Sequence, residues 1–176
     1  SRQTKLKRGS VLKELHDVGL LVAMVPEFAP VVGRVHHDIY HTYTVDVHSV
    51  AAVDQLAALC RGELAAEFPL ASRVAAEIAR PTVLFLATLL HDIGRIVLND
   101  PAVAAGGYST RDLAQWSAAI VAEVRHLQPV AEIVADHYRP FRNPGEARDG
   151  GLPAASHVVK VASAYDISVG GGMSPR

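Results

Sequence analysis

The chain has 176 residues, the size of one domain, and 49% of them are hydrophobic, which is enough for a single buried core. Aromatic residues make up only 6%, while Ala, Val and Leu dominate, a composition typical of packed helices. The formal net charge of −1 lacks the basic excess of general nucleic-acid binders, so we expect no stable nucleic-acid binding.

Cysteine content and apolar runs bear on the cellular compartment. Cys60 is the single cysteine, so the chain forms no internal disulfide, which is typical of a reducing compartment. The basic residues at the start are not followed by the apolar segment of a secretory signal. The longest apolar runs, such as residues 82–90, are shorter than the ~20 residues of a membrane span. We therefore expect a cytoplasmic protein without a membrane segment.

In chain order, apolar residues first recur at three- and four-residue steps, which predicts an amphipathic helix over residues 11–25 that ends near Pro26. Residues 27–43 contain prolines, a glycine and several histidines, so we expect a loop or short broken helices there. The same periodicity predicts further helices over residues 46–64, 70–79, 82–96, 109–127, 130–138 and 153–169.

Two of these segments carry additional signals. Residues 82–96 are apolar nearly all round, which predicts the most buried helix of the domain. Ser109 and Asp112 have the spacing of a capping box, in which each side chain satisfies a free N–H group of the first helical turn. The sequence thus predicts an all-α fold, a compact bundle of about seven helices. We expect residues 1–176 to form one domain, a fragment of a larger protein.

The adjacent pair His91 and Asp92 closes the apolar run and is the strongest functional signal. A buried carboxylate without a partner costs several kcal/mol, and a divalent metal ion is one partner that an Asp and a His can bind together. His48 and His137 lie in helical segments and can converge on the same point. For each lone histidine, a hydrogen-bonded core or surface position is the competing interpretation.

The order of His48, His91-Asp92, His137 and an Asp-bearing last helix resembles the HD superfamily of metal-dependent phosphohydrolases. The segment VHHDIYHTYTVDVH, residues 35–48, closely resembles the HD domain of the bacterial PII uridylyltransferase/uridylyl-removing enzyme. The segments HDIGRI (91–96), AEIVADHY (131–138) and VVKVASAYD (158–166) resemble HD-GYP domains. Together these segments extend over most of the chain.

The sequence also departs from the HD-GYP pattern. Arg95 stands in place of a lysine, and Leu113 stands where one histidine ligand is usual. Ser163 occupies the position of a usual aspartate ligand, for which Asp166 is the only nearby carboxylate that can compensate. We therefore do not expect a cyclic di-GMP phosphodiesterase. The losses indicate a one-metal site or a site without activity.

The resemblance implies a divalent ion (Mn²⁺, Mg²⁺, Fe²⁺ or Zn²⁺) held by His48, His91 and Asp92, with further metal ligands from His137 and Asp166. Such an ion lowers the pKa of a water and binds a phosphoryl oxygen.

The resemblance also implies catalytic roles for Asp92, which is a metal ligand as well, and for Arg95 and His41. Arg95 would clamp the phosphoryl oxygens, or else serve as a cation at a helix C-terminus. His41, with His36, His37 and Asp38, would supply acid/base groups at the mouth of the site, or else belong to a polar loop.

The leading hypothesis is an HD-type metal-dependent phosphohydrolase that cleaves a phosphoester or phosphodiester. Its partners would be a phosphorylated small molecule, a nucleotide or a nucleotidylated protein. The alternative is a degenerate, non-catalytic HD module with a regulatory or ligand-sensing role in a larger signalling protein. Ser163 and Leu113 favour the alternative, whereas retention of His48, His91 and Asp92 favours the enzyme.

Overall fold

A computed structural model describes residues 10–34, 44–139 and 152–170, with the side chains of the last segment described from 154 to 164. The described residues form nine α-helices and three 3₁₀-helices, which confirms the predicted all-α fold. Seven of the α-helices have seven or more residues: α1 (Val11–Asp17), α3 (Val45–Cys60), α4 (Pro69–Glu77), α5 (Pro81–Leu90), α7 (Thr110–Ala122), α8 (Gln128–Asp136) and α9 (Leu152–Gly170). The shorter elements are α2 (Leu20–Met24), α6 (Pro101–Ala105), η1 (Pro26–Val31), η2 (Ile93–Asn99) and η3 (Arg125–Leu127).

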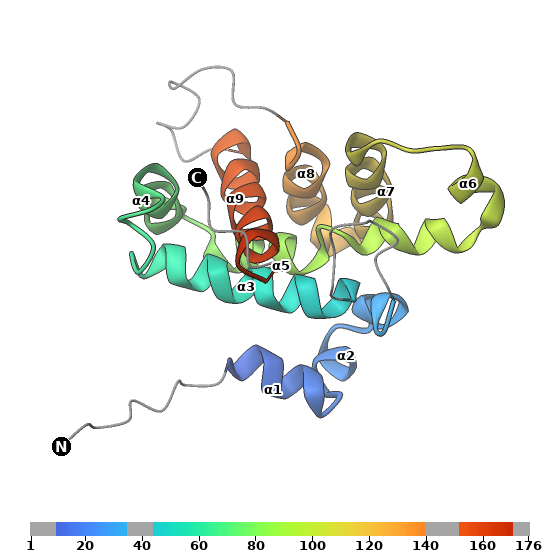
Figure 1. Ribbon diagram of the computed structural model, residues 1–176, viewed down its shortest axis with the longest axis horizontal. Helices are drawn as coiled ribbons and strands as arrows, with labels where there is room; N and C mark the ends of the chain where they lie inside the picture. Colours follow the sequence, from blue (N-terminus) through green and yellow to red (C-terminus); the bar gives the residue numbers. More distant parts are fainter. Residues whose placement is uncertain (1–9, 35–43, 140–151, 171–176) are drawn as a thin grey trace.

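The helices are arranged as a row that stands on a pair of crossing helices (Figure 1). Helices α4, α9, α8 and α7 stand side by side in that order, and each packs against its neighbour. Helix α3 runs across this row and packs against α4, α5 and α9, while α5 also contacts α8 and α9. Helices α1 and α2 lie on the opposite side of α3 from the row. The centre of the molecule is thus the place where α3, α5, α8 and α9 meet.

The core at this meeting point is built from aliphatic side chains. Leu56 of α3, Leu84 and Leu90 of α5, Val134 of α8 and Val158 of α9 are all fully buried. Each buried leucine contributes roughly 1.5–3 kcal/mol to folding by leaving water. The core therefore fixes the relative positions of four helices, and with them any polar side chains at their ends.

The expected single helix over residues 11–25 was wrong, because the chain breaks between α1 and α2. Gly19 has φ of 75°, a left-handed conformation that side chains with a Cβ rarely adopt. Ser10 caps α1 through its hydroxyl, which accepts from Lys13 N–H and donates to Asp54 of α3 over 2.6 Å. The turn at Gly19 lets α2 leave the direction of α1, which the periodicity of the apolar residues did not reveal.

The expected helix over residues 82–96 was also wrong in its length. Helix α5 ends at Leu90, and the chain continues from Ile93 as the 3₁₀-helix η2. The short helix α6 replaces part of the loop expected after Asn99, because Asp100 caps it over 2.9 Å at Ala102 N–H and Pro101 begins it. Ser109 and Asp112 form the predicted capping box of α7.

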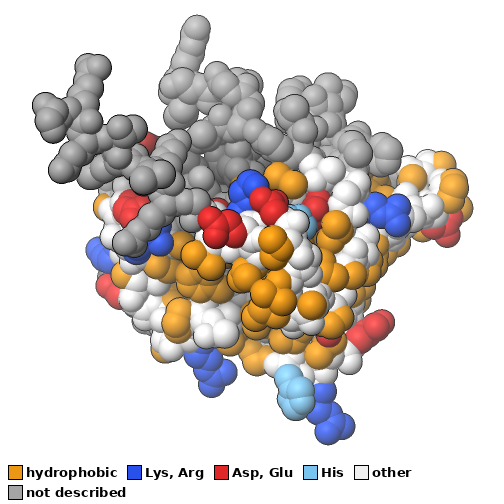
Figure 2. All heavy atoms as spheres, turned by 90° about the horizontal axis from the view of Figure 1, so that it is seen from below, with side chains coloured by type: hydrophobic (Ala, Val, Ile, Leu, Met, Phe, Trp, Pro, Cys, Tyr) orange, Lys and Arg blue, Asp and Glu red, His pale blue; other side chains and the backbone are white. Residues whose placement is uncertain are grey.

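By length and composition alone, one segment of the described residues, Pro81–Asn99, is long and apolar enough to cross a membrane. Half of its most apolar window is buried within the fold, as in the core helix of many water-soluble domains. Figure 2 shows the molecule from the side on which α1 and α2 lie. Hydrophobic side chains gather on this face. Exposed large hydrophobic residues of these two helices and of the turn between them are Val11, Val18, Leu20 and Met24.

Candidate metal centre

Four helices bring polar side chains to one buried point in the core. His48 lies in the first turns of α3, His91 directly follows α5, His137 directly follows α8, and Ser163 lies in α9. Each of these side chains is at most 7% exposed. The imidazole ring of His91 is central, with ring centroids 5.3 Å from His48 and 5.3 Å from His137.

His91 and His137 are oriented in the same way by the ends of their helices. Each is the C-cap residue, and its Nδ1 donates to the carbonyl three residues earlier, over 2.7 Å to Thr88 and 2.6 Å to Val134. The last carbonyls of a helix lack partners within the helix, so a histidine at this position satisfies one of them. With Nδ1 protonated, Nε2 of each ring carries a lone pair, the atom that binds metals.

Ser163 connects two of the histidines. Its Oγ lies 3.0 Å from Nε2 of His91 and 3.1 Å from Nε2 of His48. Because Nε2 of His91 can only accept, the hydroxyl donates to His91 and accepts from His48. Without an ion, Nε2 of His48 thus carries a proton, and binding of a metal through this atom requires the other tautomer of the ring.

Asp92 completes the group. Its Oδ2 accepts from Nε of Arg95 over 2.8 Å and lies 3.8 Å from Nε2 of His91. Its Oδ1 is fully buried and has no hydrogen-bond partner among the described residues. Nε2 of His137 is likewise buried and without a hydrogen-bond partner among these residues. Unsatisfied buried polar atoms are rare in folded proteins and are often explained by an ion or a water.

Burial and charge set the protonation of the site. Complete burial lowers the pKa of His91 to about 3, although the nearby Asp92 opposes this shift. Burial also lowers the pKa of His137. Burial raises the pKa of the Asp92 carboxyl, but coulombic interactions with His91 and Arg95 outweigh burial and hold this pKa well below its ordinary value. Neutral imidazoles beside an ionised carboxylate are the protonation states that metal binding requires.

The donor set fits a divalent metal ion. His48, His91 and Asp92 each offer one ligand atom, and these atoms lie within 4.8 Å of one another. Two nitrogens and one carboxylate oxygen, with coordination positions left for water or substrate, are typical of catalytic rather than structural metal sites. The unpartnered Oδ1 of Asp92 supports the same conclusion from an independent observation.

The structure brings together most of the residues predicted from the sequence. His137 lies beside the group of three, in ring contact with His91, and Arg95 is ion-paired with Asp92. His41 and the side chain of Asp166 lie outside the described residues, so their predicted roles remain predictions. Leu113, at a usual histidine position, is 2% exposed and belongs to the buried interior.

Sequence reasoning missed two interactions. The sequence indicates Ser163 only as the replacement of a usual aspartate. Its bridge to His48, 115 positions earlier in the chain, and to His91, 72 positions earlier, has no local signal. No local signal marks His16 either: its side chain is mostly buried, and its Nε2 lies 2.8 Å from Oδ2 of Asp46. This pair ties α1 to the start of α3, two residues before His48.

An all-α bundle with a buried His–His–Asp group at the meeting point of its helices defines a class of metal-binding helical domains. The chain belongs to the HD domain family, since the model of that family matches residues 45–167. That stretch contains His48, His91, Asp92 and His137. The resemblance of residues 91–166 to HD-GYP domains stays a prediction.

The chain is also similar to bifunctional uridylyltransferase/uridylyl-removing enzymes. It is 43% identical over 86 residues to the enzyme of Novosphingobium aromaticivorans, which covers 49% of this chain and 9% of the relative. It is 43% identical over 84 residues to the enzyme of Thiobacillus denitrificans, a stretch that covers 48% of this chain and 10% of the relative. The enzyme of Ruegeria pomeroyi is 41% identical over 93 residues, a stretch that covers 51% of this chain and 10% of the relative. The chain thus matches about a tenth of the length of these relatives. No solved structure matches the chain.

Proposed function

We propose that this domain is an HD-type, metal-dependent phosphohydrolase that cleaves a phosphoester or phosphodiester of a nucleotide or of a nucleotidylated substrate. The observation that carries the proposal is the convergence of His48, His91 and Asp92 within 4.8 Å in a buried site. The buried Oδ1 of Asp92, which has no hydrogen-bond partner among the described residues, supports the presence of an ion at this site.

The residues of the site divide the work. His48, His91 and Asp92 hold the ion, and the carbonyl of Thr88 keeps the Nε2 lone pair of His91 aimed at it. A bound divalent ion polarises the phosphoryl group and makes water nucleophilic at neutral pH. Arg95 holds Asp92 ionised and oriented through their 2.8 Å hydrogen bond. We propose that the same guanidinium also stabilises the negative charge that develops on the phosphate. We propose that His41 serves as an acid/base group.

The relatives support the choice of substrate class. Their name describes the removal of uridylyl groups, and a uridylyl group is joined through a phosphate. Removal by water is therefore hydrolysis of a phosphodiester. We extend this chemistry to the present chain as far as a nucleotide or nucleotidylated substrate.

A non-catalytic HD module is the second candidate, and one observation favours it. Ser163 lies between His48 and His91, at the position where the family pattern has a carboxylate, so the ion loses one charged ligand. In this reading the domain binds an ion or a nucleotide without turnover and reports its presence to a larger protein.

Hydrolysis of a model phosphodiester tests the proposal. Bis-p-nitrophenyl phosphate and the p-nitrophenyl ester of UMP are offered with Mn²⁺, Mg²⁺, Fe²⁺ or Zn²⁺ in turn. We expect metal-dependent release of nitrophenol that falls at least 100-fold in His48→Ala and His91→Ala but stays unchanged in His126→Ala. His126 is an exposed histidine in η3 and serves as the matched control. Stoichiometric metal binding without hydrolysis of either ester would instead support the non-catalytic module.

A further inference from the structure

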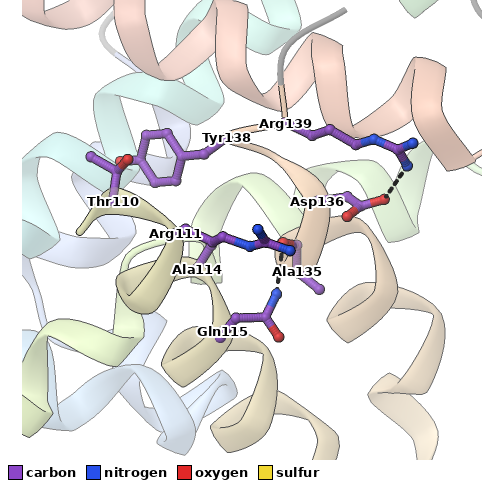
Figure 3. A pocket seen from close by; sticks show the side chains of 8 residues that line it. All are labelled: Thr110, Arg111, Ala114, Gln115, Ala135, Asp136, Tyr138 and Arg139. Carbon is purple, nitrogen blue, oxygen red and sulfur yellow. Dashed lines mark hydrogen bonds and ion pairs between the residues drawn. The ribbon is translucent and has the colours of Figure 1, made fainter. Parts of the chain in front are cut away.

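A pocket opens between the start of α7 and the end of α8 (Figure 3). Its volume is about 460 Å³, within the roughly 300–1,000 Å³ typical of small-molecule sites. Thr110, Arg111 and Gln115 line it from α7, while Asp136, Tyr138 and Arg139 line it from the end of α8. The lining is thus mainly polar, which favours a polar or charged ligand over an apolar one.

The charges of the pocket favour an anion. Arg139 forms an ion pair with Asp136 over 3.5 Å, so these two charges offset each other. Arg111 is exposed, makes no ion pair with any other described residue, and extends across the pocket in Figure 3. The side chains that line the pocket therefore carry a net charge of +1, supplied by Arg111. A guanidinium suits phosphate because its N–H groups can bind two oxygens at once.

Tyr138 connects the pocket with the candidate metal centre. Its side chain lines the pocket, and its ring lies 4.1 Å from that of His137, measured between centroids. The ring of His137 in turn lies 5.3 Å from that of His91. The pocket is therefore separated from His91 by the rings of Tyr138 and His137.

We propose that this pocket binds the phosphate of a nucleotide, with Arg111 as the main anchor and the hydroxyls of Thr110 and Tyr138 as further donors. This inference rests on the proposed function in one respect, since the nucleotide would be the product that the metal site releases. The pocket is much larger than one phosphate, so it has room for the nucleoside part beside the Tyr138 ring. The pocket binds the nucleotide whether or not the ion is present.

Calorimetric titration of the whole chain with UMP and with uridine, in EDTA and then with Mn²⁺, tests this proposal. We expect UMP to bind in both conditions and uridine to bind at least tenfold more weakly. Arg111→Gln should weaken UMP binding roughly 10- to 100-fold, the effect of one charge-assisted hydrogen-bonding group. Asp136→Asn removes the opposing charge and should tighten UMP binding several-fold.

Arg73→Gln is the matched control, because Arg73 is an exposed arginine of α4, outside the pocket. We expect it to bind UMP as the unaltered chain does. Opposite effects of Arg111→Gln and Asp136→Asn would not result from a loss of folding. Equal binding of UMP and uridine, or an unchanged affinity for UMP in Arg111→Gln, would overturn the proposal that this pocket binds phosphate.

The failure of this inference and that of the proposed function are distinguishable. A chain that holds stoichiometric Mn²⁺ and hydrolyses the model esters, but does not bind UMP in EDTA, would overturn the pocket alone. A chain that binds UMP through Arg111, but holds no metal and hydrolyses nothing, would overturn the proposed function and leave the pocket standing.

Discussion

The backbone N–H of Gly94 donates a hydrogen bond of 2.9 Å to the hydroxyl of Ser117, and the two residues are in direct backbone contact. A Cβ built on Gly94 would collide with the Ser117 nitrogen and would lie 2.8 Å from the Leu113 carbonyl oxygen. Gly94 thus lets η2 approach α7 directly after the metal-ligating pair. This close approach determines where the chain goes once His91 and Asp92 have been placed.

Gly94→Ala should destabilise the fold, because the added methyl meets backbone atoms that cannot move without shifting α7. We expect a loss of about 1–3 kcal/mol, which lowers Tm by roughly 2–12 °C in a chain of this size. Gly106→Ala is the control, since Gly106 has φ of −71° and its Cβ would meet nothing nearer than 3.4 Å. Thermal unfolding compares the two, and equal Tm values would contradict the close packing.

Ser163→Asp should strengthen metal binding. The substitution places a carboxylate beside Nε2 of His48 and Nε2 of His91, where the hydroxyl now lies 3.1 and 3.0 Å away. A fourth ligand and an added negative charge should tighten Mn²⁺ binding at least tenfold. Titration calorimetry measures the change, with Ser163→Ala as the control that removes the hydroxyl without adding charge. An affinity equal to that of Ser163→Ala would show that residue 163 does not face the ion.

The metal-free protein should lose stability as the solution becomes acidic. The unfolded chain protonates its histidines near pH 6.5, whereas burial lowers the pKa of His91 to about 3 and also lowers that of His137. Between these values the unfolded state binds more protons than the folded state, so its stability falls as pH falls below about 6.5. Each such histidine contributes a slope of about 1.4 kcal/mol per pH unit.

Denaturant unfolding in EDTA from pH 7.5 to 4.5 checks this expectation. His91→Gln should give a shallower dependence, and His126→Ala should leave the slope as it is. The same slope in His91→Gln as in the unaltered chain would contradict the assignment to His91.

His16→Ala should weaken the attachment of α1 to the core. The substitution removes the 2.8 Å partner of Asp46 and leaves a carboxylate, 5% exposed, without that partner. We expect a loss of about 1–3 kcal/mol and faster amide hydrogen exchange in α1. Lys13→Ala is the control, because its ion pair with Asp17 is solvent-exposed and contributes little. If His16→Ala and Lys13→Ala behaved alike, the buried pair would not be what holds α1.

Much of the fold and of the site follows from the sequence, for physical reasons that differ by residue. The helical periodicity and the capping box of Ser109 and Asp112 are local signals, so the all-α fold and the start of α7 could be predicted. His91 and Asp92 are adjacent at the end of an apolar run, so their burial and need for a partner were visible as well.

What could not be predicted depends on contacts between distant segments. Beyond the end of helix α5 at Leu90, Gly94 packs against Ser117 of α7, and periodicity carries no information about such a neighbour. The bridge from Ser163 to His48 and the pocket beside Tyr138 likewise exist only once α7, α8 and α9 have packed.

Metal content after loading is the most direct test of the central claim that His48, His91 and Asp92 hold a divalent ion. The protein is incubated with Mn²⁺ or Zn²⁺, freed of excess ion by gel filtration, and analysed for metal by elemental analysis. We predict about one ion per chain in the unaltered protein and in His126→Ala. We predict loss of most of that metal in His91→Ala, with helical content retained by circular dichroism. Equal metal in His91→Ala and His126→Ala, or no metal in the unaltered protein, would contradict the account.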